Sequence, residues 1–298
     1  MSAPRTTVVV ITRDRCAELL HTLAHLEALP DTGPIVVVDN ASTDGTADAV
    51  RAHHPGVELI VASQNLGAVG RNVAVERVRT PYVTFCDDDT RPEAEALGRA
   101  VAVLDAHPAV ATITGRCVVE PDLVDDPITP EMRDSPVPAP PGLPGPALLG
   151  IMAGLTTIRV AAFRGAGGFH PRMWLGGEEE LLALDLAAAG WWLCWREDVV
   201  VHHAPSRLRD PRERRRLGIR NTLWTLWLRR PVRSALRRSA VVLRGAPADR
   251  TTAAAVLDAL RGVRWVAAQR RVVPAEVERG LTLLEAPQRR SAARRYVG

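Results

Sequence analysis

The sequence predicts an α/β fold in which a mainly parallel, Rossmann-like sheet is flanked by helices and followed by a C-terminal helical extension. Two observations lead to this fold class. Residues 6–90 alternate short β-branched runs with leucines at helical spacing, which is the pattern of βαβ units. The residues after Ser206 lose the strand pattern and combine arginine clusters with aliphatic side chains at helical spacing.

The first βαβ unit consists of the apolar runs at residues 8–11 and 35–38, with leucines at helical spacing between them. The pattern then continues through a helix at 44–51, a strand at 57–62, a helix at 68–78 and a strand at 82–86. Ligands of such sheets bind beyond the carboxyl ends of the strands. Polar residues that directly follow a strand are therefore the first candidates for a site.

Residues 121–146 interrupt this order, because they are rich in proline and poor in periodic apolar residues. They predict a long irregular loop, which we expect to be mobile and to affect access of an acceptor. Regular structure returns with a strand at 155–160, a helix at 178–189 that Gly190 ends, and a strand at 199–202. We expect a domain over residues 1–205 and an arginine-rich helical region over 206–298.

Composition excludes several classes of protein. All 38 basic residues are arginine, and the net charge of +4 is modest for 298 residues, so we expect no nucleic-acid partner. The four cysteines follow no CxxC spacing and predict neither a zinc site nor a disulfide framework. The apolar run at residues 7–12 is too short for a signal peptide, which predicts a cytoplasmic protein.

The strongest chemical signal is the triplet Asp87, Asp88 and Asp89, which directly follows an apolar strand. Three adjacent carboxylates repel one another and need a compensating cation. Carboxylate oxygens suit Mg²⁺ or Mn²⁺, which in turn bind the phosphates of nucleotides. A solvated acidic turn is the alternative, and the position at an exposed strand end favours a metal site.

Two further segments follow predicted strands. Asp39 ends a buried strand, where a carboxylate needs polar partners such as a nucleoside, although a role in capping the next helix is also open. The segment from Gln64 to Asn72 contains two glycines that permit close backbone approach, and Arg71 in it could meet a phosphate. A plain loop before a helix is the alternative for this segment.

Together these motifs resemble the inverting family-2 glycosyltransferases of GT-A fold, which use nucleotide-sugar donors. The resemblance begins at residues 11–15, continues through Asp39, Asn65–Gly67, Arg71 and the aspartate triplet, and resumes from Gly167 to His203. It covers roughly residues 6–203, with the proline-rich stretch unmatched. The family implies transfer of a sugar from a nucleoside diphosphate to an acceptor hydroxyl with inversion, by metal-assisted single displacement.

The resemblance also assigns roles to residues. It implies that Asp87 to Asp89 stand for the DxD motif, with Asp89 as the direct ligand of Mn²⁺ or Mg²⁺ and Asp87 beside the ribose or diphosphate. His203 matches the histidine that can complete the metal shell, although a structural role is common for such a residue. The donor-binding residues it implies are Thr12, Arg13, Asp39, Asn65, Gly67, Arg71, Asp87 and Asp88.

The catalytic base is expected in the run Glu178, Glu179 and Glu180 at the start of a helix. The family carries a glutamate-aspartate pair here, and this chain has glutamate in place of the aspartate, which leaves the choice open. We favour Glu179, with Glu178 as the second candidate. Helix electrostatics alone also favour acidic residues at this position. Trp174 could be a stacking platform for an acceptor sugar or a core residue.

Several features remain open in the sequence. The donor could be UDP-, dTDP- or GDP-linked, and the acceptor a saccharide, a lipid-linked or a small molecule. A nucleotidyltransferase is disfavoured, because the first strand lacks a following glycine-rich phosphate loop. A non-catalytic protein that binds sugar or a membrane surface is disfavoured by the intact acidic motifs.

The C-terminal region suggests two further contacts. Its apolar residues Leu217, Leu223, Trp224, Trp227 and Leu228 share one side of a helix flanked by arginines. Such a helix can lie on an anionic membrane surface, which would place the protein at the inner face of the membrane. The alternative is packing against the catalytic domain or, in a homo-oligomer, against a second subunit.

Overall fold

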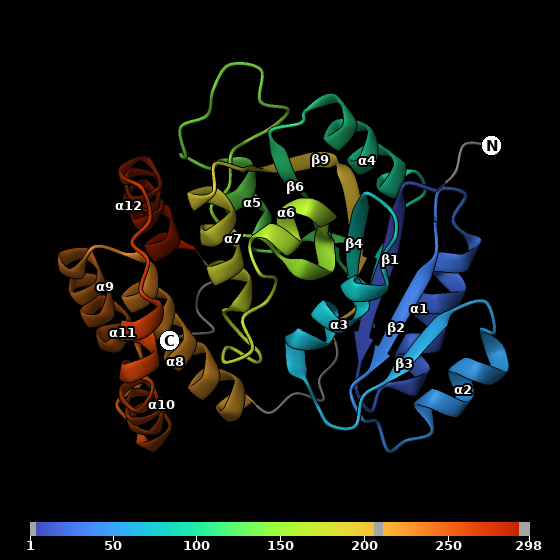
Figure 1. Cartoon of the computed structure of the whole chain (residues 1–298), viewed down its shortest axis with the longest axis horizontal. Helices are drawn as coiled ribbons and strands as arrows, with labels where there is room; N and C mark the ends of the chain where they lie inside the picture. Colours follow the sequence, from blue (N-terminus) through green and yellow to red (C-terminus); the bar gives the residue numbers. More distant parts are fainter. Residues whose placement is uncertain (1–3, 206–210, 292–298) are drawn as a thin grey trace.

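A single mixed sheet organises residues 4–205 of the computed structural model, which describes residues 4–205 and 211–291 (Figure 1). The strand order is β3-β2-β1-β4-β8-β6-β9-β5, and β7 pairs with β6. The strands are β1 Thr6–Thr12, β2 Ile35–Asp39, β3 Glu58–Val61, β4 Tyr82–Asp87, β5 Thr90–Pro92, β6 Val110–Val119, β7 Val124–Asp125, β8 Thr156–Arg159 and β9 Trp192–His203.

Helices cover both faces of this sheet and continue beyond it (Figure 1). Those inside the strand region are α1 Cys16–Ala28, α2 Thr46–His53, α3 Gly70–Arg77, α4 Ala96–Ala106, α5 Thr129–Arg133, α6 Val160–Gly165 and α7 Glu178–Ala188, with short 3-10 turns at η1 Gly67–Val69 and η2 Ala153–Leu155. The C-terminal helices are α8 Pro211–Arg229, α9 Val232–Gly245, α10 Arg250–Arg261, α11 Val263–Gln269 and α12 Ala275–Arg290.

The first half of the sheet follows the predicted βαβ order. The strands β1 to β4 pair in parallel, and the period of two divides their valines between the two faces. Val8 and Val10 pack with Leu19 of α1, whereas Val9 packs on the other face with Ala74 of α3. Full burial of such a side chain contributes about 1.5–3 kcal/mol, so β1 is stabilised from both sides.

The second half of the sheet departs from a parallel arrangement. β8 runs antiparallel to β4 and β6, and β5 runs antiparallel to β9, whereas β6 and β9 are parallel. The chain enters β8 directly from η2, and no crossover helix precedes this strand. The predicted α/β class with flanking helices is confirmed, but the sheet is mixed beyond β4.

The proline-rich stretch 121–146 is largely irregular, as expected, and is anchored at several points. Its regular parts are β7 and α5, and Val137 forms an isolated bridge with Ala147. The Ser135 hydroxyl donates a hydrogen bond to the Ala147 carbonyl at 2.6 Å. The mobility that we expect of this stretch remains a prediction.

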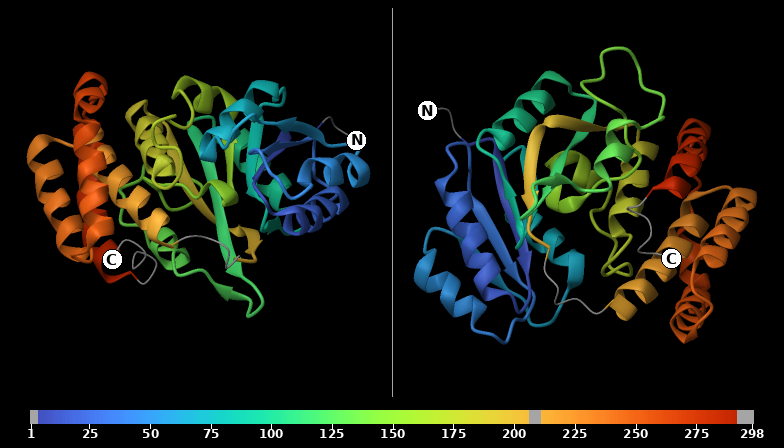
Figure 2. Two further views of the ribbon diagram at one scale, coloured as in Figure 1. Left: turned by 90° about the horizontal axis from the view of Figure 1, so that it is seen from below. Right: turned by 180° about the vertical axis from the view of Figure 1, so that it is seen from behind.

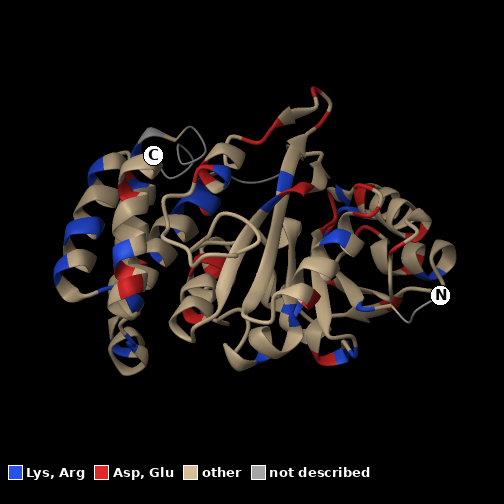
Figure 3. Cartoon of the chain, turned by 90° about the horizontal axis from the view of Figure 1, so that it is seen from above, with Lys and Arg blue, Asp and Glu red and all other residues tan. Residues whose placement is uncertain are grey.

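The C-terminal helices lie beside α7, on the side of the molecule away from α1 and α2 (Figures 1 and 2). Many of the arginines lie on them (Figure 3). Ile219, Leu223 and Leu228 of α8 share a buried cluster with Leu181 of α7. The Arg229 guanidinium also forms two hydrogen bonds with the Asp185 carboxylate, at 2.5 and 2.9 Å.

The apolar face of α8 is thus part of the protein's own packing. Leu223, Trp224 and Leu228 are buried, and Trp227 packs against the same cluster. The sequence left open whether this face meets a membrane or the protein, and the structure shows packing within the chain. None of the helices in residues 4–205 and 211–291 is long and apolar enough to cross a bilayer. The expected division at residues 205 and 206 falls beside residues 206–210, which lie outside the described part.

A substitution of Trp224 tests whether this face of α8 is core. The Trp224 indole donates to the Ala259 carbonyl at 2.9 Å, and 6% of the residue is exposed. Trp224→Ala should lower the free energy of unfolding by about 3–5 kcal/mol, because it opens a cavity and removes the hydrogen bond. Urea denaturation measures the change. Leu236→Ala is the control, because Leu236 is 64% exposed and should change stability by no more than about 0.5 kcal/mol. Equal effects of the two changes would contradict this packing.

Candidate active site

The carboxyl ends of β1, β2 and β4 meet at one edge of the sheet. Thr12 is the register partner of Asp39, and Ile11 is the partner of Asp87. The chain then turns through Asp88 and Asp89 into β5, which pairs with the end of β9 and places Thr90 opposite His203. The predicted donor and metal residues from three strands are therefore neighbours.

Two residues of the aspartate triplet point into the protein, in contrast to the expected exposed strand end. Asp88 is 5% exposed and Asp89 is 1% exposed, whereas a third of the Asp87 side chain is exposed. The Thr12 hydroxyl donates to Asp88 Oδ2 at 2.9 Å, and the Thr22 hydroxyl donates to the Asp88 carbonyl at 2.8 Å. Asp88 is thus held by the protein itself, and its role in donor binding stays a prediction.

Arg15 supplies the positive charge that this buried pair of carboxylates needs. Its guanidinium lies 2.7 Å from Asp88 Oδ1 and 2.9 Å from Asp89 Oδ2, and only 11% of its side chain is exposed. We did not assign a role to Arg15 from the sequence, although it belongs to the motif at residues 11–15. This role could have been predicted from the sequence, because three adjacent carboxylates need a positive charge nearby.

The two buried carboxylates differ in their pKa values. Burial raises the pKa of Asp88 to about 7, the negative charges of Asp89 and Asp87 add to this effect, and Arg15 opposes it. Burial would also raise the pKa of Asp89, but the neighbouring His203 imidazole and the Arg15 charge outweigh this effect and lower that pKa to about 2. Asp89 is therefore ionised at neutral pH. His203 Nε2 lies 3.6 Å from Asp89 Oδ1, so a carboxylate and an imidazole face each other where the metal was predicted.

Asp39 keeps one carboxylate oxygen without a protein partner. Its Oδ1 accepts the backbone N–H of Ser42 at 2.8 Å, whereas its fully buried Oδ2 makes no hydrogen bond with any described residue. An unpaired buried oxygen is costly, so a ligand with an N–H or O–H group would be stabilised here. Arg13, which we expect to hold the nucleoside, has 45% of its side chain exposed and lies 3.3 Å from Asp14.

The loop before α3 is held by Trp174. The Trp174 indole donates to the Asn65 carbonyl at 3.1 Å, and its own carbonyl accepts from the Ala68 N–H at 2.7 Å. Gly67 has a φ of +58°, and a Cβ there would lie 2.4 Å from the Trp174 carbonyl oxygen, so no larger residue fits. Asn65 Oδ1 accepts the Gly67 N–H at 2.9 Å and closes the turn.

Arg71 lies next to the exposed member of the triplet. Its guanidinium donates to Asp87 Oδ1 at 2.5 Å and lies over the rings of Phe85 and Phe169, with 6.0 and 5.6 Å to the ring centroids. Its Nε atom is buried and has no partner among the described residues. The arrangement leaves a fixed positive charge beside Asp87, as a diphosphate would require.

The glutamates at the start of α7 reach the same place from the other half of the sheet. Glu179 Oε1 accepts the Ala153 N–H at 2.5 Å, and a Cβ on the adjacent Gly154 would lie 2.9 Å from Asp87 Oδ2. The turn η2 therefore contacts both acidic motifs. Burial, together with the negative charge of Glu178, raises the pKa of Glu179 to about 8. Burial also raises the pKa of Glu178, whose Oε2 has no hydrogen-bond partner in the described chain.

Asn221 of α8 fixes the turn from which α7 begins. Its fully buried side-chain amide donates to the carbonyls of Met173, Leu175 and Gly176, at 2.8, 3.1 and 2.5 Å. Gly177 has a φ of +96°, and a Cβ there would lie 3.1 Å from the Asn221 Cβ. Asn221 was not predicted as a functional residue, because in the sequence it is a single amide among the apolar residues of a helix.

Comparison with known proteins supports the resemblance. Residues 7–164 match the family model described as Glycosyl transferase family 2. The putative teichuronic acid biosynthesis glycosyltransferase TuaG of Bacillus subtilis is 28% identical over 92 residues, which are 30% of this chain and 36% of TuaG. The poly(ribitol-phosphate) β-N-acetylglucosaminyltransferase TarS of Staphylococcus aureus is 35% identical over 94 residues, which are 30% of this chain but only 16% of TarS. The matches thus span a minor part of both relatives.

Solved structures share the fold. The mannosyltransferase PcManGT from Pyrobaculum calidifontis, determined with GDP-Man and Mn²⁺, aligns with a TM-score of 0.61 and 22% identity over 99% of this chain and 85% of that one. S. aureus TarS 1–349 with UDP aligns with a TM-score of 0.53 and 21% identity over 74% and 65% of the two chains. At these identities the likeness shows the fold alone.

Replacement of Arg15 tests its role as the counter-charge. Arg15→Gln should lower the free energy of unfolding by about 3 kcal/mol in EDTA, because it leaves buried carboxylates uncompensated. Added Mn²⁺ should then stabilise this variant more than the wild-type protein, since a metal ion can replace the lost charge. Urea denaturation with and without Mn²⁺ measures both effects.

The matched control for Arg15 is Arg13→Gln, because Arg13 makes only an exposed ion pair and should shift stability by about 0.5 kcal/mol or less. An Arg15→Gln protein as stable as Arg13→Gln in EDTA would show that the aspartates need no counter-charge from Arg15.

Proposed function

The chain belongs to glycosyl transferase family 2, and we propose that it transfers a sugar from a nucleotide-sugar donor to an acceptor hydroxyl, with metal assistance and inversion at the anomeric carbon. The observation that carries this proposal is the contact of both acidic motifs with η2. Glu179 accepts a hydrogen bond from Ala153, and Asp87 lies against Gly154, although these motifs are far apart in the sequence. A proton acceptor thus lies next to the predicted diphosphate site.

The residues around Asp89 fit a hard divalent cation such as Mn²⁺ or Mg²⁺. Asp89 is ionised, and His203 Nε2 faces its Oδ1 at 3.6 Å, so an oxygen and a nitrogen donor converge. In this proposal Asp89 and His203 hold the cation. When bound, the cation would neutralise charge on the leaving diphosphate. PcManGT was determined with Mn²⁺, which is consistent with this assignment.

The chain's own residues then have separate tasks. The free Oδ2 of Asp39 accepts a hydrogen bond from the nucleoside. The amide of the adjacent Asn40 donates to the Gly67 carbonyl at 3.2 Å and so ties the Gly67 turn to this strand end. Arg71 pairs with the diphosphate, which its fixed position beside Asp87 favours. Glu179 removes the proton of the acceptor hydroxyl while that oxygen attacks the anomeric carbon and the bond to the diphosphate breaks. Attack opposite the leaving group gives inversion.

The C-terminal helices support this base in the proposal. Asn221 holds the turn before α7, and Arg229 pairs with Asp185 on the same helix. We therefore propose that the helices of residues 211–291 hold α7 in place against the sheet domain. Contact with an anionic lipid or with a second copy remains a proposal, and it would use the exposed Val232 and Leu236 of α9 rather than α8.

The alternatives differ in what they require of the site. A nucleotidyltransferase would need a phosphate-binding loop after β1, but α1 follows there at Cys16 without glycine. A non-catalytic sugar-binding protein would not need a proton acceptor at Glu179. The donor base, the sugar, the acceptor and a cytoplasmic location stay open in this proposal.

Nucleotide binding tests the metal ligand. In wild-type protein, a nucleoside diphosphate with Mn²⁺ at about 100 times its Kd should add about 2.7 kcal/mol of stability, which a thermal-shift screen of UDP, dTDP and GDP would detect. Asp89→Asn should lose the part of this gain that depends on Mn²⁺.

Because Asp89 is buried and paired with Arg15, the substitution itself will cost stability. Each variant is therefore compared with itself, with and without Mn²⁺. The control is Asp122→Asn, which changes an exposed carboxylate and should keep the full shift. A full Mn²⁺-dependent shift in Asp89→Asn would exclude Asp89 as a ligand.

Substitution of the base tests catalysis apart from binding. Glu179→Gln preserves size but removes proton acceptance, so the transfer rate should fall by about 10²-fold or more while nucleotide binding stays near normal. Glu197→Gln makes the same chemical change at an exposed position and should retain the wild-type rate. If Glu178→Gln alone shows the loss, the base is Glu178. Full transfer rates in both variants would exclude both glutamates as the catalytic base.

The pH dependence of kcat/KM provides a further test. The pKa of Glu179 is about 8 in the free protein, so at lower pH the group is protonated and cannot accept a proton. The value of kcat/KM should therefore rise as the pH increases from 6 towards 8 and level off above it, because kcat/KM reflects the free enzyme. A profile that is flat across this range would contradict an elevated pKa of the base.

A further inference from the structure

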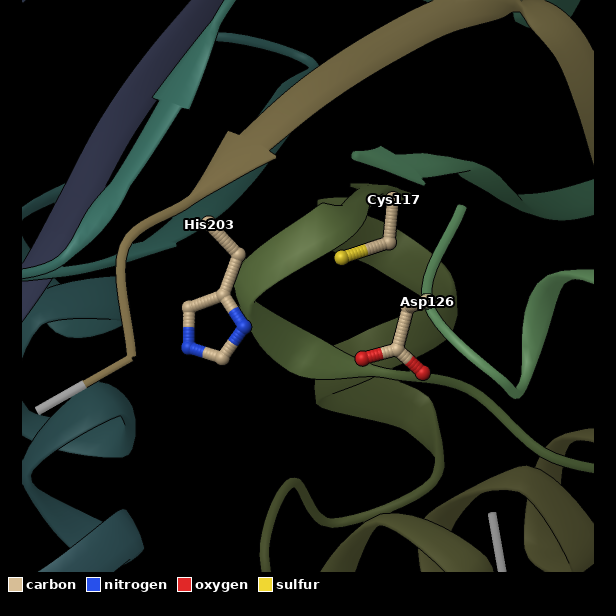
Figure 4. A group of neighbouring side chains, drawn as sticks. All are labelled: Cys117, Asp126 and His203. Carbon is tan, nitrogen blue, oxygen red and sulfur yellow. The ribbon is translucent and has the colours of Figure 1, made fainter. Parts of the chain in front are cut away.

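A group of three possible metal ligands lies behind His203, away from the carboxylates of the donor site. Cys117 of β6, Asp126 just after β7 and His203 at the end of β9 each present one ligand atom, and these atoms lie within 4.8 Å of one another (Figure 4). Cys117 is 1% exposed, whereas Asp126 and His203 are half-buried. The group is thus open to solvent on one side.

Strand pairing fixes the three residues relative to one another. In the parallel β6–β9 pair, Cys117 lies opposite Val201 and Val119 opposite His203. The backbone N–H of Asp126 donates to the Cys117 carbonyl at 2.9 Å, which joins the third residue to the same strand. Side chains fixed by paired strands need little rearrangement to bind an ion. Most of the conformational entropy of ordering them is therefore lost on folding and not on metal binding.

Other contacts occupy only some of the polar atoms of this group. The Cys117 thiol makes no hydrogen bond with the described residues of the chain. Asp126 Oδ1 accepts the Ile128 N–H at 2.9 Å, which orients the carboxylate without closing its remaining coordination sites. Figure 4 shows the sulfur, the carboxylate and one ring nitrogen of His203 turned towards one another.

We propose that Cys117, Asp126 and His203 form a second divalent-cation site, which takes Zn²⁺ or a similar thiolate-binding ion rather than Mg²⁺ or Mn²⁺. Sulfur, imidazole and carboxylate are all ligands of zinc, whereas magnesium prefers oxygen alone. Zinc–ligand distances are about 2.0–2.3 Å, so the three groups must move together slightly to bind one ion. The thiol releases its proton to solvent on binding, and water fills the open position.

His203 connects this site to the donor site. The ring nitrogen next to the side-chain attachment, Nδ1, faces Cys117 and Asp126 in Figure 4, whereas Nε2 lies 3.6 Å from Asp89. A neutral imidazole that binds a metal through Nδ1 carries its proton on Nε2. If Asp89 and His203 hold the donor's cation, as the proposed function states, zinc at the second site would compete with that role.

Cobalt titration of the full chain tests the site without any assay of transfer. Co²⁺ is a spectroscopic substitute for Zn²⁺, and a sulfur–cobalt bond gives a charge-transfer absorption in the near ultraviolet. Wild-type protein should develop this band with stoichiometric Co²⁺ and lose it when Zn²⁺ is added. The absence of a band in wild-type protein would overturn the proposal, whatever the variants do.

Variants assign the band to its ligands. Cys117→Ser should abolish it, and Asp126→Asn, which alters a half-buried loop carboxylate, should weaken Co²⁺ binding. Cys16→Ser is the matched control, because Cys16 is the cysteine outside the buried set and its loss should leave the band unchanged. A band that survives in Cys117→Ser but disappears in Cys16→Ser would overturn the assignment.

One more variant separates this inference from the proposed function. Asp89→Asn should keep the cobalt–sulfur band, since Asp89 is not a ligand of the second site. If nucleotide binding proves independent of metal while the band is present, the second site stands and the donor-metal assignment fails. Loss of the band in a folded Asp89→Asn protein would show that the second site is not separate and would overturn it.

Discussion

The rest of the site depends on one constraint, which is that the buried carboxylates at the carboxyl ends of β1, β2 and β4 must be compensated. Asp39 and Asp89 are almost fully inside the protein, and Asp39 of β2 and Asp87 of β4 end the two strands on either side of β1. Such charges persist only when cations or hydrogen-bond donors surround them. Arg15, Arg71 and the serine backbone N–H near Asp39 supply part of this compensation.

Some buried polar atoms of the site have no partner in the described part of the protein. These atoms indicate which groups the proposed ligand must carry. Asp39 Oδ2 has no donor, and Arg71 Nε has no acceptor among the described residues. An oxygen without a donor fits the N–H or O–H of a nucleoside, and an unsatisfied guanidinium N–H fits a phosphate oxygen. The unpartnered acceptor of Asp39 and the unpartnered donor of Arg71 lie at the same edge of the sheet, because Asp39 and Asp87 flank the end of β1.

Much of the first half of the fold and site could be predicted because its signals are local. The valine runs, the leucine spacing and the polar residue after each strand indicated β1 to β4 and placed Asp39, Arg71 and the triplet together. The antiparallel course of β8 could not be predicted, because strand direction depends on how the chain returns from residues 121–146. The burial of Asp88 and Asp89 was also missed, since it depends on Arg15 folding back onto them.

The residues that the sequence did not reveal act over long distances. Asn221 of α8 holds the turn before α7 through a hydrogen bond to the Gly176 carbonyl, and the two residues are 45 positions apart in the sequence. Cys117 and Asp126 reach His203 only because β6 pairs with β9. A single asparagine or cysteine belongs to no sequence motif that would reveal its role. That role depends on the tertiary contacts that the fold creates.

Anomalous diffraction from crystals grown with Mn²⁺ and the nucleoside diphosphate that stabilises the protein most would test the central claim directly. The account predicts a manganese peak between Asp89 and His203 Nε2. It also predicts that the nucleoside lies near Asp39 and the diphosphate beside Arg71. A bound nucleotide with no manganese at Asp89, or a manganese peak only among Cys117, Asp126 and His203, would contradict it.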